Sequence, residues 1–256
     1  MQKLYTRVSA ACSVAVVGAM FAGVPAGSAG SRAIFHHPRV AVSRPGTRAA
    51  GWASSNWSGY ALSGSGYSSV TGQWIVPAVA ASRTATYSAD WVGIDGFNNS
   101  NLIQTGTESD YYNGRMHYGA WWEILPAAET VIRSIVVHPG DTVTASITKV
   151  SGSSWRITIT DGGQTFTTTR TYTGPQTSVE WIEEAPSVGG RVAPLANYGQ
   201  TTFDPGTVNG QSPSLGSSNG GVMVQGGQVS TPSGPDSDAD GFNIAYGSSA
   251  PAPPSS

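Results

Sequence analysis

The chain has 256 residues, of which only 11% are charged, and its formal net charge at neutral pH is −2. That length fits a single all-β domain and can bury a sizeable core. All 15 acidic residues follow residue 50, together with 13 − 6 = 7 of the basic ones. Residues 51–256 therefore carry 7 − 15 = −8, which argues against nucleic acid as a partner and suits a protein that works in acid.

Residues 1–29 are expected to be a secretory signal peptide. Lys3 and Arg7 precede an apolar run from Val8 to Val24, and small residues follow at 27–29. A transmembrane anchor is the alternative, but the run is short and contains Gly and Ser. The only cysteine, Cys12, lies in this leader. We therefore expect a secreted, extracellular chain without disulfides, a cysteine nucleophile or a cysteine-bound zinc ion, and with no membrane contact after cleavage.

Residues 30–50 form a basic segment that is either a propeptide or a linker. Its arginines, at positions 32, 39, 44 and 48, have no acidic residue within the segment. Attraction to the acidic body would hold a propeptide loosely near neutral pH and weaken in acid, where His36 and His37 also gain charge. Surface pairs of this kind are weak, so the sequence leaves both alternatives open.

The body, residues 51–247, is predicted to be antiparallel β-structure. A period-two pattern marks a strand at 69–76, and three strands at 142–150, 155–161 and 164–173 are separated by SGSS and GG turns. Further short strands are predicted at 87–94, 102–108, 116–125, 134–137, 179–184 and 242–246. This pattern indicates a sandwich or barrel. We expect the Ser/Pro tail, residues 248–256, to be disordered.

Common hydrolase and metal motifs are missing from the sequence. It contains neither GxSxG nor HExxH, and His117 is the only reasonable base for a serine triad, because His138 lies in a turn-like HPGD. The sequence DSDADG, residues 236–241, resembles the start of a calcium loop, but the twelfth position is Gly247 where an EF-hand has Glu. A hairpin turn is favoured there, so we expect no metal and no cofactor.

Two segments carry candidate catalytic groups. In the strand SVEWIEE, period two places Glu180 and Glu184 on one face and Glu183 on the other. A solvated acidic edge strand is the alternative. In LIQTG, Gln104 lies in an apolar strand on the face of Leu102, where a buried amide needs hydrogen-bond partners, whether for function or for structure.

Taken together, these segments resemble the glutamic peptidases, or eqolisins. The resemblance rests on SNWSGY (55–60), WIVP (74–77), WVGIDG (91–96), LIQTG (102–106), AWWEILP (120–126) and VEWIEEAP (179–186). It implies a two-sheet antiparallel β-sandwich of the concanavalin A-like lectin and glucanase type. It also implies proteolysis in acid by Gln104 and Glu184.

The same resemblance implies four substrate-binding residues: Trp57, Asp95, Trp121 and Glu123. Three departures leave the substrate preference open. Fungal members carry disulfides, Leu125 stands where they have an aromatic residue, and Gly119 stands where an acid is expected.

The sequence thus predicts an acid endopeptidase that acts on proteins or peptides as a monomer. Glu184 would activate water and Gln104 would stabilise the oxyanion. A carbohydrate-active or carbohydrate-binding protein on the same sandwich is the alternative, because Glu123, Glu180 and Glu184 offer carboxylates and eight tryptophans suit sugar stacking. A noncatalytic binding module is the third possibility.

Overall fold

The computed structural model describes residues 1, 33–43 and 51–256. The predicted signal peptide from residue 2 onward, and residues 30–32 and 44–50 of the basic segment, lie outside the described residues. Arg32–Ser256 forms one compact unit, to which the described residues 33–43 belong. Within the described part of the chain, no helix is long and apolar enough to cross a membrane.

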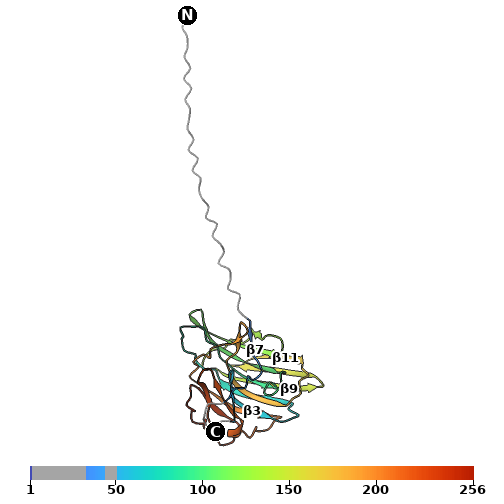
Figure 1. The fold of residues 1–256 in the computed structure, drawn as a ribbon. Helices are drawn as coiled ribbons and strands as arrows, with labels where there is room; N and C mark the ends of the chain where they lie inside the picture. The colour runs from blue at the N-terminus through green and yellow to red at the C-terminus, as the bar shows by residue number, and fades with distance from the viewer. Residues whose placement is uncertain (2–32, 44–50) are drawn as a thin grey trace. The chain divides into compact units, whose positions relative to one another are not determined.

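Strands make up nearly all of the regular secondary structure of the described residues (Figure 1). The strands are Ile34–Phe35 (β1), Trp52–Ser54 (β2), Trp57–Ser63 (β3), Ser69–Ile75 (β4), Ala89–Ile94 (β5), Ile103–Tyr112 (β6), Arg115–Ile124 (β7), Thr130–Ile132 (β8), Thr142–Ser151 (β9), Ser154–Asp161 (β10), Gln164–Thr171 (β11), Ser178–Glu184 (β12), Ser187–Val188 (β13), Arg191–Val192 (β14), Gln200–Val208 (β15), Gly220–Val224 (β16), Gln228–Pro232 (β17) and Phe242–Tyr246 (β18). A single 3-10 turn, Ser217–Asn219 (η1), interrupts the strands of the described chain.

One long sheet folds back on itself into two layers. Its order is β11-β10-β9-β4-β15-β18-β17-β16-β3-β12-β5-β6-β7-β8, with β2 added parallel to β16. Strands β4 and β9 of one arm contact β5 and β6 of the other without pairing with them. The order places β12 between β3 and β5, so all seven residues of β12 are buried. This is the all-β sandwich that the sequence predicts.

The large apolar core lies between the two layers. Alternate residues of β4, β9 and β10 meet alternate residues of β5 and β12, as expected for strands that turn one face inward. Trp74, Trp155 and Trp181 are fully buried in this core. Each buried aromatic side chain removes roughly 150–250 Å² from water, so these rings provide much of the hydrophobic stabilisation of a chain without disulfides.

A second, smaller apolar cluster covers the other face of β3, β12, β5, β6 and β7. Its members are Trp52, Trp57, Ala61, Ala89, Trp91, Leu102, Trp121 and Ile182. Trp57 and Trp91 pack edge to face with ring centroids 4.9 Å apart. Trp181 and Ile182 belong to different clusters, which confirms the predicted alternation of faces along β12. The second face holds the candidate site.

Most of the predicted strands are present in the structure, but one is not. The meander of β9, β10 and β11 is confirmed with both hairpin turns. The predicted strand at 134–137 is wrong: Ser134 lies in a turn, residues 135–137 have no regular secondary structure, and the short strand is β8 instead. The Ser/Pro tail has neither helix nor strand, but Ala252 accepts a hydrogen bond from Asn243 and Ser256 bonds Ser237.

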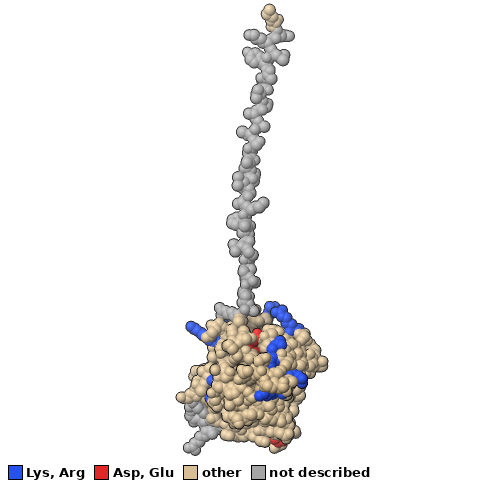
Figure 2. All heavy atoms as spheres, turned by 90° about the vertical axis from the view of Figure 1, so that its right-hand side faces the viewer, with Lys and Arg blue, Asp and Glu red and all other residues tan. Residues whose placement is uncertain are grey.

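Carboxyl groups are concentrated inside the fold and not on its surface. Nine of the 15 acidic residues are buried: Asp90, Asp95, Asp110, Asp161, Asp236, Glu123, Glu180, Glu183 and Glu184. Figure 2 shows one face of the molecule on which carboxylate atoms occupy only small areas. Buried carboxyl groups are costly as charges unless they are paired or protonated, so each needs a partner or a proton.

Candidate active site

Gln104 is buried at the centre of the second face. It stands opposite Gly93 on one side and Glu123 on the other. Its Nε2 donates to Glu123 Oε2 at 2.6 Å, while its Oε1 is buried and has no partner among the described residues. A Cβ at position 93 would lie 2.7 Å from the Trp91 ring, so a glycine is required between β6 and β12. The amide therefore has one oxygen and one N–H still available.

Glu184 ends β12, where the strand lies next to Trp57 of β3 and Ala89 of β5. Its Oε2 accepts a hydrogen bond from Trp91 Nε1 at 2.9 Å, and its Oε1 lies 3.5 Å from Asn56 Nδ2. The side chain is fully buried. The alternative of a solvated acidic edge is therefore wrong, because β12 is a central strand whose carboxyl groups are covered from both faces.

Gln104 and Glu184 face the same space without touching each other. Counted across the sheet, Gln104 aligns with Gly93 of β5, whereas Glu184 aligns with Ala89 four positions away, so the pair lies on a diagonal. One residue, His36, spans this interval. Its backbone N–H donates to Glu123 Oε2 at 3.2 Å, and its Nδ1 lies 2.9 Å from Glu184 Oε2. The space between Glu123 and Glu184 therefore accommodates the backbone of a peptide.

Residues 33–43 of the basic segment lie in this space. Strand β1 pairs with β13, and the N–H of Val40 donates to Asn56 Oδ1 at 2.8 Å. The His36 ring lies parallel to Trp121, with centroids 3.6 Å apart, and is fully buried. The N–H of His37 donates to Glu184 Oε1 at 3.1 Å. The segment therefore contacts both members of the predicted catalytic pair or their direct partners.

Three glutamates surround His36. Its Nε2 lies 3.1 Å from Glu129 Oε2, opposite the contact with Glu184. Burial by itself would lower the pKa of His36, but the charge of Glu184 and the hydrogen bonds to Glu129 and Glu184 outweigh it and hold the pKa well above its usual value. Burial raises the pKa of Glu123 to about 8, although His36 opposes this shift.

The four predicted substrate-binding residues have different surroundings. Trp121 forms one wall beside His36, and Glu123 bonds both Gln104 and His36. Trp57 packs on Trp91, which bonds Glu184, and makes no hydrogen bond through its indole N–H to any described residue. Asp95 has a left-handed φ of 72° and accepts hydrogen bonds from Tyr172, Asn99 and the 176–177 backbone, so it holds that loop.

Sequence reasoning missed four residues that line the site: His36, Asn56, Trp91 and Glu129. Trp91 and Asn56 lie inside the motifs WVGIDG and SNWSGY, which carry the family resemblance, but the motifs do not indicate what either side chain does. His36 was considered only for its charge. Glu129 lies in a loop after β7, where no periodic pattern could indicate its direction.

Glu183 points to the opposite face of β12, as predicted, and is also fully buried. It stands directly opposite Asp90 of β5. Burial raises the pKa of Asp90 to about 7 and, reinforced by the charge of Asp90, raises the pKa of Glu183 well above its usual value. Neither oxygen of Glu183 has an N–H or O–H donor among the described residues. The two carboxyl groups can satisfy each other only by sharing a proton.

The other candidate sites have ordinary structural explanations. His117 stacks on Tyr112 with centroids 3.6 Å apart and bonds the carbonyl of Tyr112, which leaves no arrangement for a serine triad. The DSDADG segment is a turn in which Asp236 N–H donates to the Gly241 carbonyl. Asp236 and Asp240 approach Asp204, with one oxygen of each within 4.8 Å of the others.

Comparison with known proteins supports the sandwich fold. The model of the Peptidase A4 family matches residues 55–246. The chain is 30% identical to aspergillopepsin-2 of Aspergillus niger over 196 residues, which are 66% of this chain and 70% of the relative. A crystal structure of scytalido-glutamic peptidase with a transition state analog inhibitor superposes with a TM-score of 0.64 at 24% identity, covering 75% of this chain and 98% of that one.

A second structure of the same fold, the eqolisin SCP-B in a complex with the tripeptide Ala-Ile-His, has a TM-score of 0.60 at 24% identity, with 75% and 98% of the two chains covered. These two structures support the sandwich fold, and the family match covers most of the chain. The chain therefore belongs to the Peptidase A4 family and is a glutamic endopeptidase.

Proposed function

We propose that this chain is a secreted endopeptidase that works in acid, with Glu184 as the general base and Gln104 as the oxyanion donor. One observation carries the proposal. Peptide backbone, at His36 and His37, lies between Glu184 and the hydrogen-bonded pair of Gln104 and Glu123. A substrate peptide in the same space would have a carboxylate and an amide on opposite sides of its scissile bond.

The first chemical step is attack by water. With the segment displaced, Glu184 Oε2 is free to accept the water proton while Trp91 Nε1 still holds the carboxylate in place. The hydroxide equivalent adds to the carbonyl carbon, and the carbonyl electron pair moves to the oxygen. Protonated Glu184 then returns the proton to the amine nitrogen as the C–N bond breaks. No acyl-enzyme forms.

Gln104 supplies the charge stabilisation. An amide NH₂ has two donors, and Glu123 occupies one of them in the structure, so the other can donate to the oxyanion. The unpartnered Oε1 of Gln104 is available to orient the water. Such donors commonly change kcat by about 10²–10³-fold.

Glu123 suits this role because it is neutral where the enzyme would work. Its pKa is raised to about 8 by burial, so at acid pH its carboxyl group adds no negative charge beside the developing oxyanion. Glu123 would then fix the Gln104 amide by hydrogen bonding alone. We propose Trp57 and Trp121 as apolar walls for substrate and Asp95 as the anchor of a neighbouring loop.

Secretion and the substrate class rest on separate support. The leader pattern of residues 1–29 favours export. The tripeptide Ala-Ile-His in the SCP-B complex belongs to that protein, but it shows that a site on this fold accepts a short peptide containing histidine. Here Ala33, Ile34 and His36 occur in the segment that contacts Glu123 and Glu184. We infer that proteins and peptides are the substrates, acted on by a monomer.

The test is digestion of a denatured protein at about pH 4, followed by mass spectrometry of the products. Wild-type enzyme should release peptides with new termini, whereas Gln104→Ala should retain roughly 1% or less of the rate. Polysaccharide in a parallel reaction should remain intact. Cleavage of the polysaccharide, or unchanged proteolysis by Gln104→Ala, would contradict the proposal.

A further inference from the structure

We propose that Asp204, Asp236 and Asp240 form a binding site for a calcium ion, which fastens the turn before β18 to strand β15. The inference does not depend on the proposed function. The three aspartates come from β15 and from the turn before β18, whereas the catalytic pair comes from β6 and β12. The proposal assigns a hard divalent cation to a cluster that the peptidase reaction does not use.

The three carboxyl groups converge from separate parts of the chain. One oxygen of each lies within 4.8 Å of the others. Asp236 and Asp240 belong to the turn DSDADG, whereas Asp204 belongs to β15, whose pairing with β4 shifts register around this residue. Irregularities of this kind commonly redirect a side chain. An EF-hand takes its ligands from one continuous loop, so the lack of its glutamate ligand does not exclude a site to which β15 contributes.

One oxygen of Asp236 is buried in this cluster without a donor. Asp236 is only 9% exposed, and its Oδ1 accepts from the N–H of Asp240 at 3.1 Å. Its Oδ2 is buried and has no hydrogen-bond partner among the described residues. A Cβ on Gly241 would collide with this Oδ2 and lie 2.8 Å from Asp204 Cγ, so the two carboxyl groups border the same small space. A buried carboxylate oxygen needs a donor, a proton or a cation, and an ion among these oxygens would supply the last.

The cluster has no basic partner. Among the described residues, no lysine, arginine or histidine forms an ion pair with any of the three aspartates. Asp238 of the same turn adds a further carboxyl group. Burial, and then the charges of Asp236 and Asp238, raise the pKa of Asp204 above its usual value. Like charges held this close repel one another, so the arrangement favours a bound cation.

The donor set selects the kind of cation. Carboxylate oxygens without nitrogen or sulfur ligands favour hard cations, and calcium accepts a more flexible geometry than magnesium does. Asp204 and Asp240 are partly exposed, so an ion can enter from solvent and water can complete its coordination. We expect a Kd of about 0.1–1 mM, the range of extracellular calcium modules.

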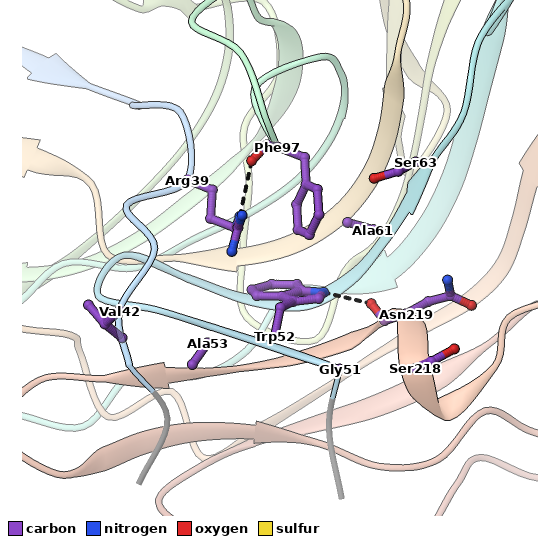
Figure 3. A pocket seen from close by; sticks show the side chains of 10 residues that line it. All are labelled: Arg39, Val42, Gly51, Trp52, Ala53, Ala61, Ser63, Phe97, Ser218 and Asn219. Carbon is purple, nitrogen blue, oxygen red and sulfur yellow. Dashed lines mark hydrogen bonds between the residues drawn. The ribbon is translucent and has the colours of Figure 1, made fainter.

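The rest of the described chain does not offer such a donor set. Among the described residues, these aspartates are the only group of three His, Cys, Asp or Glu side chains with ligand atoms this close together. The pocket beside Trp52 and Phe97 has no acidic residue in its lining, and the Arg39 guanidinium lies 4.1 Å from the centre of the Phe97 ring (Figure 3). An effect of calcium on the protein is therefore expected to arise at the cluster.

The cluster lies where the turn, β15 and the C-terminal tail meet. The Asp240 carbonyl accepts from the N–H of Gly206 at 2.8 Å, and the Ser237 side chain bonds that of Ser256 at 2.8 Å. An ion that ties the turn to Asp204 would therefore hold this end of the sheet together. In a chain with a single cysteine, it would supply a cross-link that no disulfide within the chain can form.

The test is calcium binding by the full chain at pH 7, where metal-binding carboxylates are deprotonated, in the Glu184→Gln background to prevent self-digestion. Equilibrium dialysis should give one bound calcium ion per chain. In about 10 mM calcium, the Tm should lie at least about 3 °C above its value in EDTA, by mass action. Magnesium at the same concentration should raise the Tm less. A chain that binds no calcium and shows no shift in Tm would overturn the inference.

Two variants in the same background locate the ion. Asp236→Asn and Asp240→Asn should each raise the Kd at least about tenfold and abolish the rise in Tm, because each removes a charged ligand. Asp240 is partly exposed, so its variant decides the question if Asp236→Asn fails to fold. Asp141→Asn is the control, since this turn aspartate pairs with His138 outside the cluster, and it should bind calcium like the parent. An unchanged rise in Tm in a folded cluster variant would overturn the assignment.

Discussion

The two faces of β12 carry the same kind of side chain in different surroundings. On one face, Glu184 accepts hydrogen bonds from Trp91, from His36 and from backbone N–H. On the other face, Glu183 has no donor among the described residues and meets only Asp90 across the strand pair. Both side chains are fully buried.

The difference shows that two equally buried carboxyl groups of one strand can differ in their hydrogen-bond donors. Glu184 has donors that stabilise a negative charge, so it can serve as a base. Glu183 has no such donor, and burial, reinforced by the charge of Asp90, raises its pKa well above the usual value. Of these two neighbouring residues, Glu184 can therefore serve catalysis, while Glu183 makes stability depend on pH.

The largest expected effect comes from exchanging the two glutamates for glutamine in turn. Glu184→Gln should lower kcat by about 10³-fold or more, because the amide cannot accept the water proton. Glu183→Gln should change kcat by less than about threefold at pH 4, since its side chain lies on the opposite face. Initial rates on a peptide substrate at pH 4 measure both.

Circular dichroism of both variants is the control for folding. If Glu183→Gln inactivates a folded protein while Glu184→Gln does not, the register that separates the two faces is wrong by one residue.

The next effect is on stability and concerns the Asp90–Glu183 pair. Their raised folded-state pKa values mean that the native protein keeps protons that the unfolded chain loses above about pH 4. Stability is therefore fully present below that pH and falls as the pH rises toward about 7, the value of Asp90. The loss should be on the order of 2–4 kcal/mol.

Calorimetric unfolding between pH 4 and pH 7, in the inactive Glu184→Gln background to prevent self-digestion, measures this loss. Adding Glu183→Gln should flatten the dependence of Tm on pH, because its amide can donate to an ionised Asp90. A slope unchanged by this substitution would show that other carboxyl groups, such as Asp110, cause the dependence.

The sequence predicts the fold well because the strand pattern is local. Period-two alternation is visible in β9, β10 and β12, and it correctly separates Trp181 from Ile182. It could not place β12 at the centre of the sheet, because strand order depends on contacts between residues far apart in the chain. The contact between Glu184 and His36, 148 positions apart, is not visible in any local pattern.

A smaller effect is expected from the indole that holds Glu184. Trp91→Phe keeps the apolar ring that packs on Trp57 but removes the N–H at 2.9 Å from Glu184 Oε2. We expect kcat/KM to fall by about tenfold, in line with a lost hydrogen bond to a charged group.

The matched control is Trp57→Phe, because the Trp57 indole N–H has no partner among the described residues. Its loss should be smaller than that of Trp91→Phe in the same kcat/KM assay. A larger loss would show that the full indole of Trp57, proposed above as an apolar wall for substrate, matters more than the hydrogen bond from Trp91.

The last comparison predicts no effect on activity. Chelators and serine or thiol reagents should leave the enzyme unchanged. The carboxyl groups of Asp204, Asp236 and Asp240 lie close enough to hold a cation, and Asp236 Oδ2 is buried without a donor. Burial, with the charges of its acidic neighbours, raises the pKa of Asp240 to about 6, so at pH 4 a proton already neutralises this member of the cluster. EDTA should therefore change neither the rate nor Tm at pH 4. A drop in Tm that calcium restores would show that these three aspartates bind a metal ion even in acid.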